Sequence, residues 1–218
     1  MAKRPSSTSN YAFDLEFLNE ELITYFQQHR KSESPDSLLY KGFNMSILFY
    51  STTMVEGALW RFLKFLINHY SGRQDLNTER NMVIQEFNSI NAPKDIIKTR
   101  IKQIQRFSGL DLSNDMTNPY YKDIIVLPAI RNVIAHGGVI ALSQIEKNPG
   151  FFKFQKTDLL EVLMRSDSIP EKVLHRIGEG DLPTITGAFL GDKNVDYFSE
   201  RSISFKKLLE QEKVTMTS

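Results

Sequence analysis

The sequence predicts a mostly all-α fold, in which a bundle of four to five helices precedes a C-terminal extension that includes a short strand. Three observations predict it. Apolar residues recur at intervals of three and four through most of the first 138 residues, as they do on the buried face of an α-helix. Short segments rich in Gly, Pro, Asn and Ser separate these runs and are typical of turns. The chain has 218 residues, of which 41% are apolar, so it can bury one sizeable core.

The first four helices follow from their apolar faces and from the residues that end them. Residues 1–10 are polar and rich in Ser, and we expect them to be a disordered lead-in. The second helix is the longest and begins near either Asp36 or Phe43. With the earlier start Gly42 would divide it, because a glycine inside a helix costs about 1 kcal/mol relative to alanine. The four predicted helices span residues 11–29, 36 or 43 to 70, 78–90 and 93–107.

A fifth helix is predicted over residues 120–136. Pro128 either kinks this helix or lies near the start of its last part, because proline cannot donate the hydrogen bond that a helix interior requires. The later elements expected are a strand at 151–157 and helices at 158–165, 168–176 and 197–212. The predicted divisions of the chain are a lead-in at 1–10, a helical bundle at 11–138, and an extension of mixed short helices packed on it at 139–218.

Composition excludes several classes of protein. Lys and Arg total 27 against 26 Asp and Glu, which excludes a strongly basic arm or an acidic tail but permits a local basic face. The absence of Cys excludes disulfides, thiolate metal sites and cysteine nucleophiles. No apolar run approaches the roughly 18 residues that span a bilayer, and the polar N-terminus lacks the apolar segment of a signal peptide. We expect a cytoplasmic protein with no membrane partner.

Most catalytic and cofactor motifs are absent from the sequence. The four histidines are far apart and have no acidic companions at metal-ligand spacing, so no metal site is predicted. No Gly-rich phosphate loop follows a strand and no G-x-S-x-G motif occurs, so the residues for the common nucleotide sites and for serine hydrolysis are missing. No cofactor is predicted.

One cluster combines three chemically useful side chains on an otherwise apolar helix. It consists of Arg131, Asn132 and His136, followed by Gly137 and Gly138. Asn132 and His136 share a helix face, whereas Arg131 and His136 lie about 140° apart and converge only if the arginine reaches round or the helix loosens at its end. A histidine in the last turn of a helix also interacts favourably with the helix dipole, whatever the function. Spacing alone leaves both interpretations open.

The stretch RNVIAHG, at the end of an apolar helix in a helical bundle, resembles the HEPN superfamily, whose signature is an arginine followed after four to six residues by a histidine. The resemblance covers about residues 11–138. It implies a metal-independent endoribonuclease of the kind found among toxins and antiphage effectors. It also implies RNA as substrate, a homodimer with a composite site at its interface, and an antitoxin or regulatory protein as a further partner. One HEPN subgroup has a tyrosine, a modification site, where this chain has Gly138.

The chemistry of these side chains agrees with that implication. In-line attack by a ribose 2′-OH requires removal of one proton, delivery of another, and donors for the charge on the phosphoryl oxygens. His136 would exchange protons near neutral pH, Arg131 would hold the non-bridging oxygens, and Asn132 would orient His136 or the phosphate. One chain supplies one such histidine, so a two-fold dimer would supply the second.

Glu56 and a basic stripe complete the candidate site. By the resemblance, an acidic residue on the second helix faces the motif, so Glu56 would pair with Arg131 and fix its direction; otherwise Glu56 is a partly exposed surface carboxylate. The stripe consists of Lys94, Lys98, Lys102 and Arg106 at i,i+4 spacing. It is either a solvated helix face or a low-specificity track for the RNA backbone.

Two other functions stay open at this stage. A HEPN module that binds a nucleotide, RNA or a protein partner without catalysis would carry the same motif, since a fold and a motif do not guarantee turnover. A purely structural helical dimer would use the motif only as a helix end. Residues 139–218 have no counterpart in the resemblance.

Overall fold

The computed structural model describes residues 8–70, 77–89, 95–128, 130–131, 143–148, 151–155 and 191–217. The elements are α1 (Thr8–Arg30), α2 (Leu38–Tyr70), α3 (Thr78–Asn88), α4 (Ile96–Ser108), α5 (Tyr121–Ile124), β1 (Ser143–Asn148), β2 (Phe151–Gln155) and α10 (Asp192–Thr217). Helices make up most of the described residues, which confirms the predicted mostly all-α class. The helices expected at 158–165 and 168–176 lie outside the described residues.

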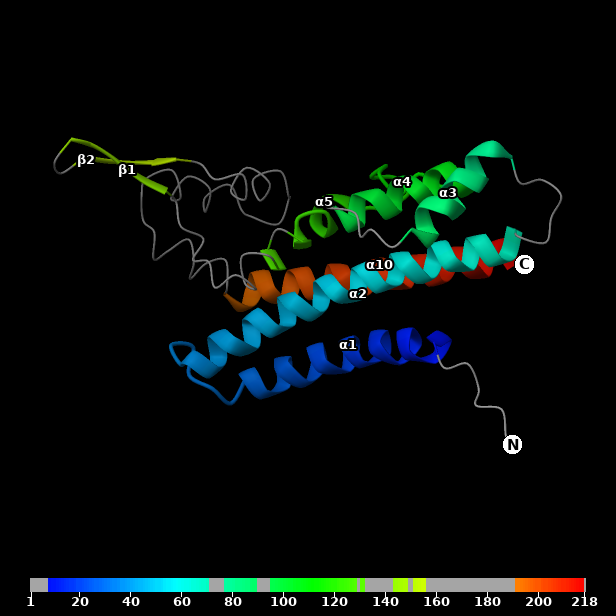
Figure 1. Cartoon of the computed structure of the whole chain (residues 1–218). Coiled ribbons are helices and arrows are strands. Elements are labelled where there is room, and N and C mark those ends of the chain that lie inside the picture. Colours follow the sequence, from blue (N-terminus) through cyan, green and yellow to red (C-terminus); the bar gives the residue numbers. More distant parts are fainter. Residues whose placement is uncertain are drawn as a thin grey trace, which may run out of the picture.

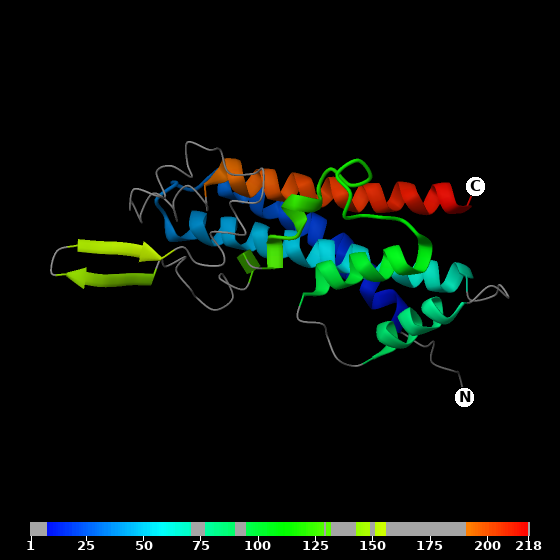
Figure 2. The same ribbon diagram turned by 90° about the horizontal axis from the view of Figure 1, so that it is seen from above.

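α2 is the central helix of the bundle (Figure 1). α1 runs antiparallel to it on one side, and α10 runs beside it in the same direction. α3, α4 and α5 lie on the other side of the α2–α10 pair from α1, and the view from above shows α4 alongside α2 (Figure 2). Helices far apart in the sequence therefore share one interior.

α2 begins at Leu38 and continues through Gly42 without a break, so the earlier of the two expected starts is close to the observed one and Gly42 does not divide the helix. The hydroxyl of Ser37 accepts a hydrogen bond from the backbone N–H of Tyr40 at 3.0 Å and caps the first turn. The buried face that begins at Ile47 stabilises the helix by far more than the roughly 1 kcal/mol that an exposed glycine costs.

One core surrounds α2 and draws on the C-terminal helix as well as on the earlier ones. α10 contributes Val195, Phe198, Phe205 and Leu209, each at most 2% exposed. They belong to the same apolar cluster as the buried face of α2. The predicted division after residue 138 therefore does not separate a complete bundle from an appendage, because α10 closes the bundle. The closing helix expected at 197–212 is present and extends further at both ends.

A buried arginine joins three helix ends. Arg30, the last residue of α1, has a side chain that is 5% exposed. Its Nη2 donates to both carboxylate oxygens of Asp196 on α10, at 2.9 and 2.7 Å, and its Nη1 donates to Asn44 Oδ1 on α2 at 2.8 Å. Its Nε lies 3.5 Å from Asp192 Oδ1, to which Asn44 Nδ2 also donates. We call Arg30, Asn44, Asp192 and Asp196 the Arg30 clamp; it ties the end of α1 to the beginnings of α2 and α10.

α4 begins at Ile96, later than predicted, because Asp95 accepts a hydrogen bond from the backbone N–H of Lys98 and acts as the N-cap. Gly109 ends the helix with φ of 80°, a left-handed conformation that glycine adopts at no steric cost. Ile97, Ile101 and Ile104 are buried as expected.

The single helix predicted over 120–136 is interrupted. α5 ends at Ile124, residues 125 and 126 form a turn, and the backbone is helical again at Leu127, Pro128, Ile130 and Arg131. Pro128 lies in the first turn of this second segment, where its missing N–H breaks no helical hydrogen bond. Pro128 was expected either to kink a continuous helix or to lie near the start of its last part. The structure shows the second arrangement.

A two-stranded hairpin contains the predicted strand. β2 covers most of residues 151–157 and pairs antiparallel with β1. β1 could not be predicted, because SQIEKN has neither the alternation nor the β-branched and aromatic content of a typical strand.

Candidate functional site

The Glu56–Arg131 ion pair lies where α2 meets the helical segment that starts at Leu127. Arg131 Nη1 donates to both carboxylate oxygens of Glu56, at 2.6 and 2.7 Å. One turn earlier on both segments, Thr52 Oγ1 contacts the carbonyl oxygen of Leu127 at 3.3 Å. Each segment advances by four residues between the two contacts, so the segments run alongside each other in the same direction. The ion pair predicted for Glu56 is present.

Burial decides the electrostatics of this pair. The Glu56 side chain is 14% exposed and the Arg131 side chain 23%. Burial raises the pKa of the Glu56 carboxyl above its ordinary value, and the neighbouring Arg131 lowers it by less. Both oxygens accept from Nη1, so the ion pair engages one of the three guanidinium nitrogens. The carboxylate thus fixes the direction in which the guanidinium points.

The remaining motif residues, Asn132 and His136, lie outside the described residues, as do Gly137 and Gly138. The structure places the arginine and the carboxylate of the candidate site, and the roles of the imidazole and the amide stay predictions. Among the side chains that the structure describes, no three His, Asp or Glu gather in a group that could hold a metal ion.

The basic stripe on α4 is less uniform than its spacing suggests. Lys94 lies outside the described residues, and Lys102 is exposed. Lys98 pairs with Asp95 at 3.3 Å, an exposed contact that contributes little to stability.

Among the described residues of the stripe, Arg106 makes the strongest polar interactions. Its Nη1 donates to both carboxylate oxygens of Glu86 at 2.9 and 3.0 Å, and its Nε donates to Glu79 at 3.3 Å. These hydrogen bonds from Arg106, and another from Gln103, lower the pKa of the Glu86 carboxyl. Two carboxylates therefore offset the charge of Arg106, which makes it the weakest candidate for an RNA contact among the described members of the stripe.

A second buried carboxylate connects α5 to α10. Asp123 is 4% exposed, and its Oδ2 accepts a hydrogen bond from the Tyr197 hydroxyl at 2.9 Å. The guanidinium of Arg201 lies 3.6 Å from the same oxygen and over the rings of Tyr120 and Tyr197. Burial and the hydrogen bond to Asp123 raise the pKa of Tyr197. The sequence did not predict this group, since Tyr120 and Asp123 lie more than seventy residues before Tyr197 and Arg201.

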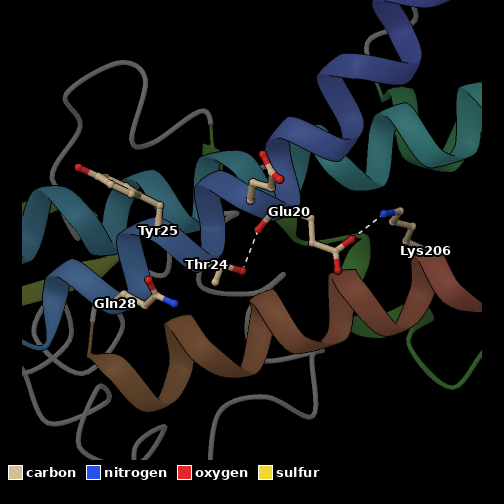
Figure 3. Close-up of a pocket in the computed structure, with 6 residues that line it drawn as sticks. Glu20, Thr24, Tyr25, Gln28 and Lys206 are labelled. Carbon is tan, nitrogen blue, oxygen red and sulfur yellow. Dashed lines mark hydrogen bonds and ion pairs between the residues drawn. The ribbon is translucent and has the colours of Figure 1, made fainter.

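An open groove of about 420 Å³ lies between α1 and α10 (Figure 3). Its lining includes Glu20, Thr24, Tyr25 and Gln28 from α1 and Lys206 from α10. Lys206 Nζ donates to Glu20 Oε2 at 2.6 Å, and Thr24 Oγ1 donates to the backbone oxygen of Glu20 (Figure 3). The Lys206–Glu20 ion pair thus connects the two helices beside the groove, and no predicted site residue lines the groove.

Comparisons with known proteins leave this geometry as the main guide to function. None of the helices in the described part of the chain has the length and hydropathy to span a bilayer. No family model matches the chain, and neither a curated protein nor a solved structure matches it.

Proposed function

We propose that the protein is a metal-independent endoribonuclease of the HEPN kind that cleaves RNA as a homodimer. The observation that supports this most is the Glu56–Arg131 ion pair, since the resemblance implied a carboxylate facing the motif arginine from the second helix. The two residues are far apart in sequence, and burial of both side chains favours a specific geometry over a chance surface contact.

The ion pair offers a catalytic advantage to a phosphate-binding arginine. A long side chain loses roughly 2 kcal/mol of rotamer entropy when it is immobilised. Glu56 holds Arg131 before RNA arrives, so binding does not have to offset that loss in full. The guanidinium would then stabilise the charge that develops on the non-bridging phosphoryl oxygens.

In the proposed reaction, one His136 takes the proton of a ribose 2′-OH while the 2′-oxygen attacks the adjacent phosphorus. The bond from phosphorus to the 5′-oxygen breaks, and the partner subunit's His136 delivers a proton to that oxygen. The products are a 2′,3′-cyclic phosphate and a 5′-hydroxyl. Asn132 would orient His136 or the phosphate. In a cell, such an activity would suit a toxin or antiphage effector that an antitoxin or regulatory protein restrains.

Cleavage of a generic RNA in EDTA tests the proposal. The His136→Ala variant should lose activity by about 10²- to 10⁴-fold, the usual contribution of general acid–base catalysis, while keeping its fold and its dimer. His29→Ala is the matched control, because His29 is an exposed histidine at the end of α1. Activity that requires a divalent cation, or cleavage by the His136→Ala variant at the rate of the wild type, would contradict the mechanism.

The role of the ion pair has its own test. Arg131→Lys keeps the charge but loses the planar donor fork, and we expect cleavage to fall with it. Glu56→Gln should reduce cleavage less, since it removes only the group that positions the arginine. A Glu56→Gln variant that is impaired more than Arg131→Lys would show that the carboxylate acts in the reaction directly.

A further inference from the structure

Trp60, Lys64, Phe87 and Arg100 form a group in which aromatic rings and cations are in contact, and we call it the aromatic–cation platform. The Trp60 and Phe87 rings are stacked, with centroids 5.8 Å apart and planes 30° apart. Lys64 Nζ lies 4.8 Å from the Trp60 ring centroid, and the Arg100 guanidinium lies 4.9 Å from that of Phe87. All four residues are partly exposed. The rings and cations are therefore accessible to a ligand at this surface.

The platform begins one helical turn from the candidate site. Glu56, Trp60 and Lys64 follow one another at four-residue intervals on α2, so they lie on one face of the helix. Along the axis, Trp60 is about 6 Å and Lys64 about 12 Å beyond Glu56. Glu56 holds Arg131, and a strand of RNA whose phosphate lies at Arg131 would therefore continue onto the platform.

The charge around the platform favours a polyanion. Residues 57–70, 78–88 and 95–108 contain seven Lys and Arg against three Asp and Glu, although the whole chain is nearly neutral. On the opposite side of α2, the described side chains of α1 include Glu20 and Glu21, and the arginine of α1 is buried in the Arg30 clamp. α3 and α4, which carry most of these cations, lie on the other side of α2 from α1 (Figure 1).

Arg100 is held in position for a phosphate contact. Its Nη1 donates to Gln103 Oε1 at 2.8 Å, and Gln103 is 3% exposed. Gln103 Nε2 in turn donates to Glu86 at 3.1 Å. The buried amide of Gln103 thus orients the Arg100 guanidinium. In these hydrogen bonds the Glu86 carboxylate contacts the amide and not the guanidinium.

We infer that the aromatic–cation platform binds the single-stranded RNA next to the scissile phosphate. An unpaired base takes the place of Lys64 over the Trp60 ring, which is stacked on Phe87, while Lys64 and Arg100 contact the neighbouring phosphates. Every base has a face that can stack on an aromatic ring, so this binding is tolerant of sequence but requires an unpaired strand. The identity of the ligand rests on the proposed ribonuclease function. The arrangement of rings and cations is independent of it.

Trp60 is the single tryptophan of the chain, so its fluorescence reports directly on the platform. A 2′-O-methyl oligoribonucleotide is a suitable probe, because it lacks the attacking 2′-OH and binds without being cleaved. We expect saturable quenching of Trp60 by this oligonucleotide and much weaker quenching by a duplex of the same sequence. Binding without any change in Trp60 fluorescence, or equal quenching by the duplex, would overturn the inference.

Anisotropy of a labelled 2′-O-methyl oligonucleotide measures the variants. Trp60→Leu should weaken binding by about tenfold and Trp60→Phe by less, because phenylalanine can still stack. Lys64→Ala and Arg100→Ala should each weaken binding and reduce the magnitude of the salt slope by about 0.7. Lys41→Ala is the matched control, an exposed lysine on α2 about 35 Å along the axis from Lys64.

The two proposals fail in different ways. Binding that depends on the platform, without cleavage of unmodified RNA, would sustain the inference and contradict the ribonuclease. Cleavage that depends on His136, with platform variants that bind as the wild type does, would contradict the inference alone. If Trp60→Leu does not fold, the wild-type quenching and the two cation variants still decide. Binding of an acidic protein at the platform instead of RNA would also overturn it.

Discussion

Replacing Asp196 with alanine should destabilise the protein by about 2–3 kcal/mol. The change removes the closest anionic partner of Arg30, whose guanidinium stays buried with Asn44 and the more distant Asp192. Breaking a buried ion pair from one side typically costs about 3–5 kcal/mol. The loss expected for Asp196→Ala lies below this typical range for two reasons. Asp192 still offsets the charge of Arg30, and the Asp196 side chain is 34% exposed, which weakens the pair.

Replacing Arg30, the other partner of the ion pair, should destabilise the protein less than replacing Asp196. Arg30→Met removes the buried charge and fills most of its volume with an apolar chain. The carboxylates that remain are 34% and 44% exposed, so water can solvate them. We expect a loss of under about 1.5 kcal/mol, since replacing a buried ion by a hydrophobic residue of similar size is often close to neutral.

Urea unfolding at neutral pH, followed by circular dichroism, measures both variants. For a chain of this length, the loss for Asp196→Ala corresponds to a fall in Tm of about 4–12 °C. Glu200→Ala, which changes an exposed carboxylate of α10, is the control and should stay within about 0.5 kcal/mol of the wild type. A larger loss for Arg30→Met than for Asp196→Ala would refute the reasoning, because it would mean that the arginine stabilises mainly through packing.

Two further predictions concern pH and the core. Burial raises the pKa of Glu56, so its contribution to stability is greatest when it is protonated and is lost as the pH rises through the raised pKa. The free energy of unfolding of the wild type minus that of Glu56→Gln should therefore fall as the pH increases above 4.5, the ordinary glutamate value, in urea titrations at several pH values. Phe205→Ala removes a fully buried ring of α10 and should cost about 3–5 kcal/mol in the same assay, whereas a loss below 1 kcal/mol would mean that α10 is not essential to the core.

Local patterns account for most of what could be predicted. The helices at 11–29, 36 or 43 to 70, 78–90 and 197–212 follow from local sequence patterns, which depend only on neighbouring residues, and the structure differs from them mainly at their ends. The position of Pro128 was one of two alternatives, because the sequence shows that proline disturbs a helix but not where the chain turns. β1 carries no strand pattern of its own and depends on its pairing with β2.

Long-range contacts account for what could not be predicted. The contacts of Arg30 could not be predicted, since its partners Asp192 and Asp196 lie far along the chain. The pairing of Glu56 with Arg131 was predicted from the HEPN resemblance and not from spacing, because no local pattern relates two residues on separate helices. The place of α10 in the core likewise depends on packing that a single sequence does not reveal.

The late position of α10 in the chain has a consequence for biosynthesis. The ribosome completes α2 long before it synthesises Val195, Phe198 and the rest of the last helix, so the groove that they fill stays open to solvent during most of translation. A chain that lacks α10 exposes this apolar surface, and exposed apolar surface of this kind promotes aggregation. The core around α2 is therefore incomplete until α10 has been synthesised and has packed against it.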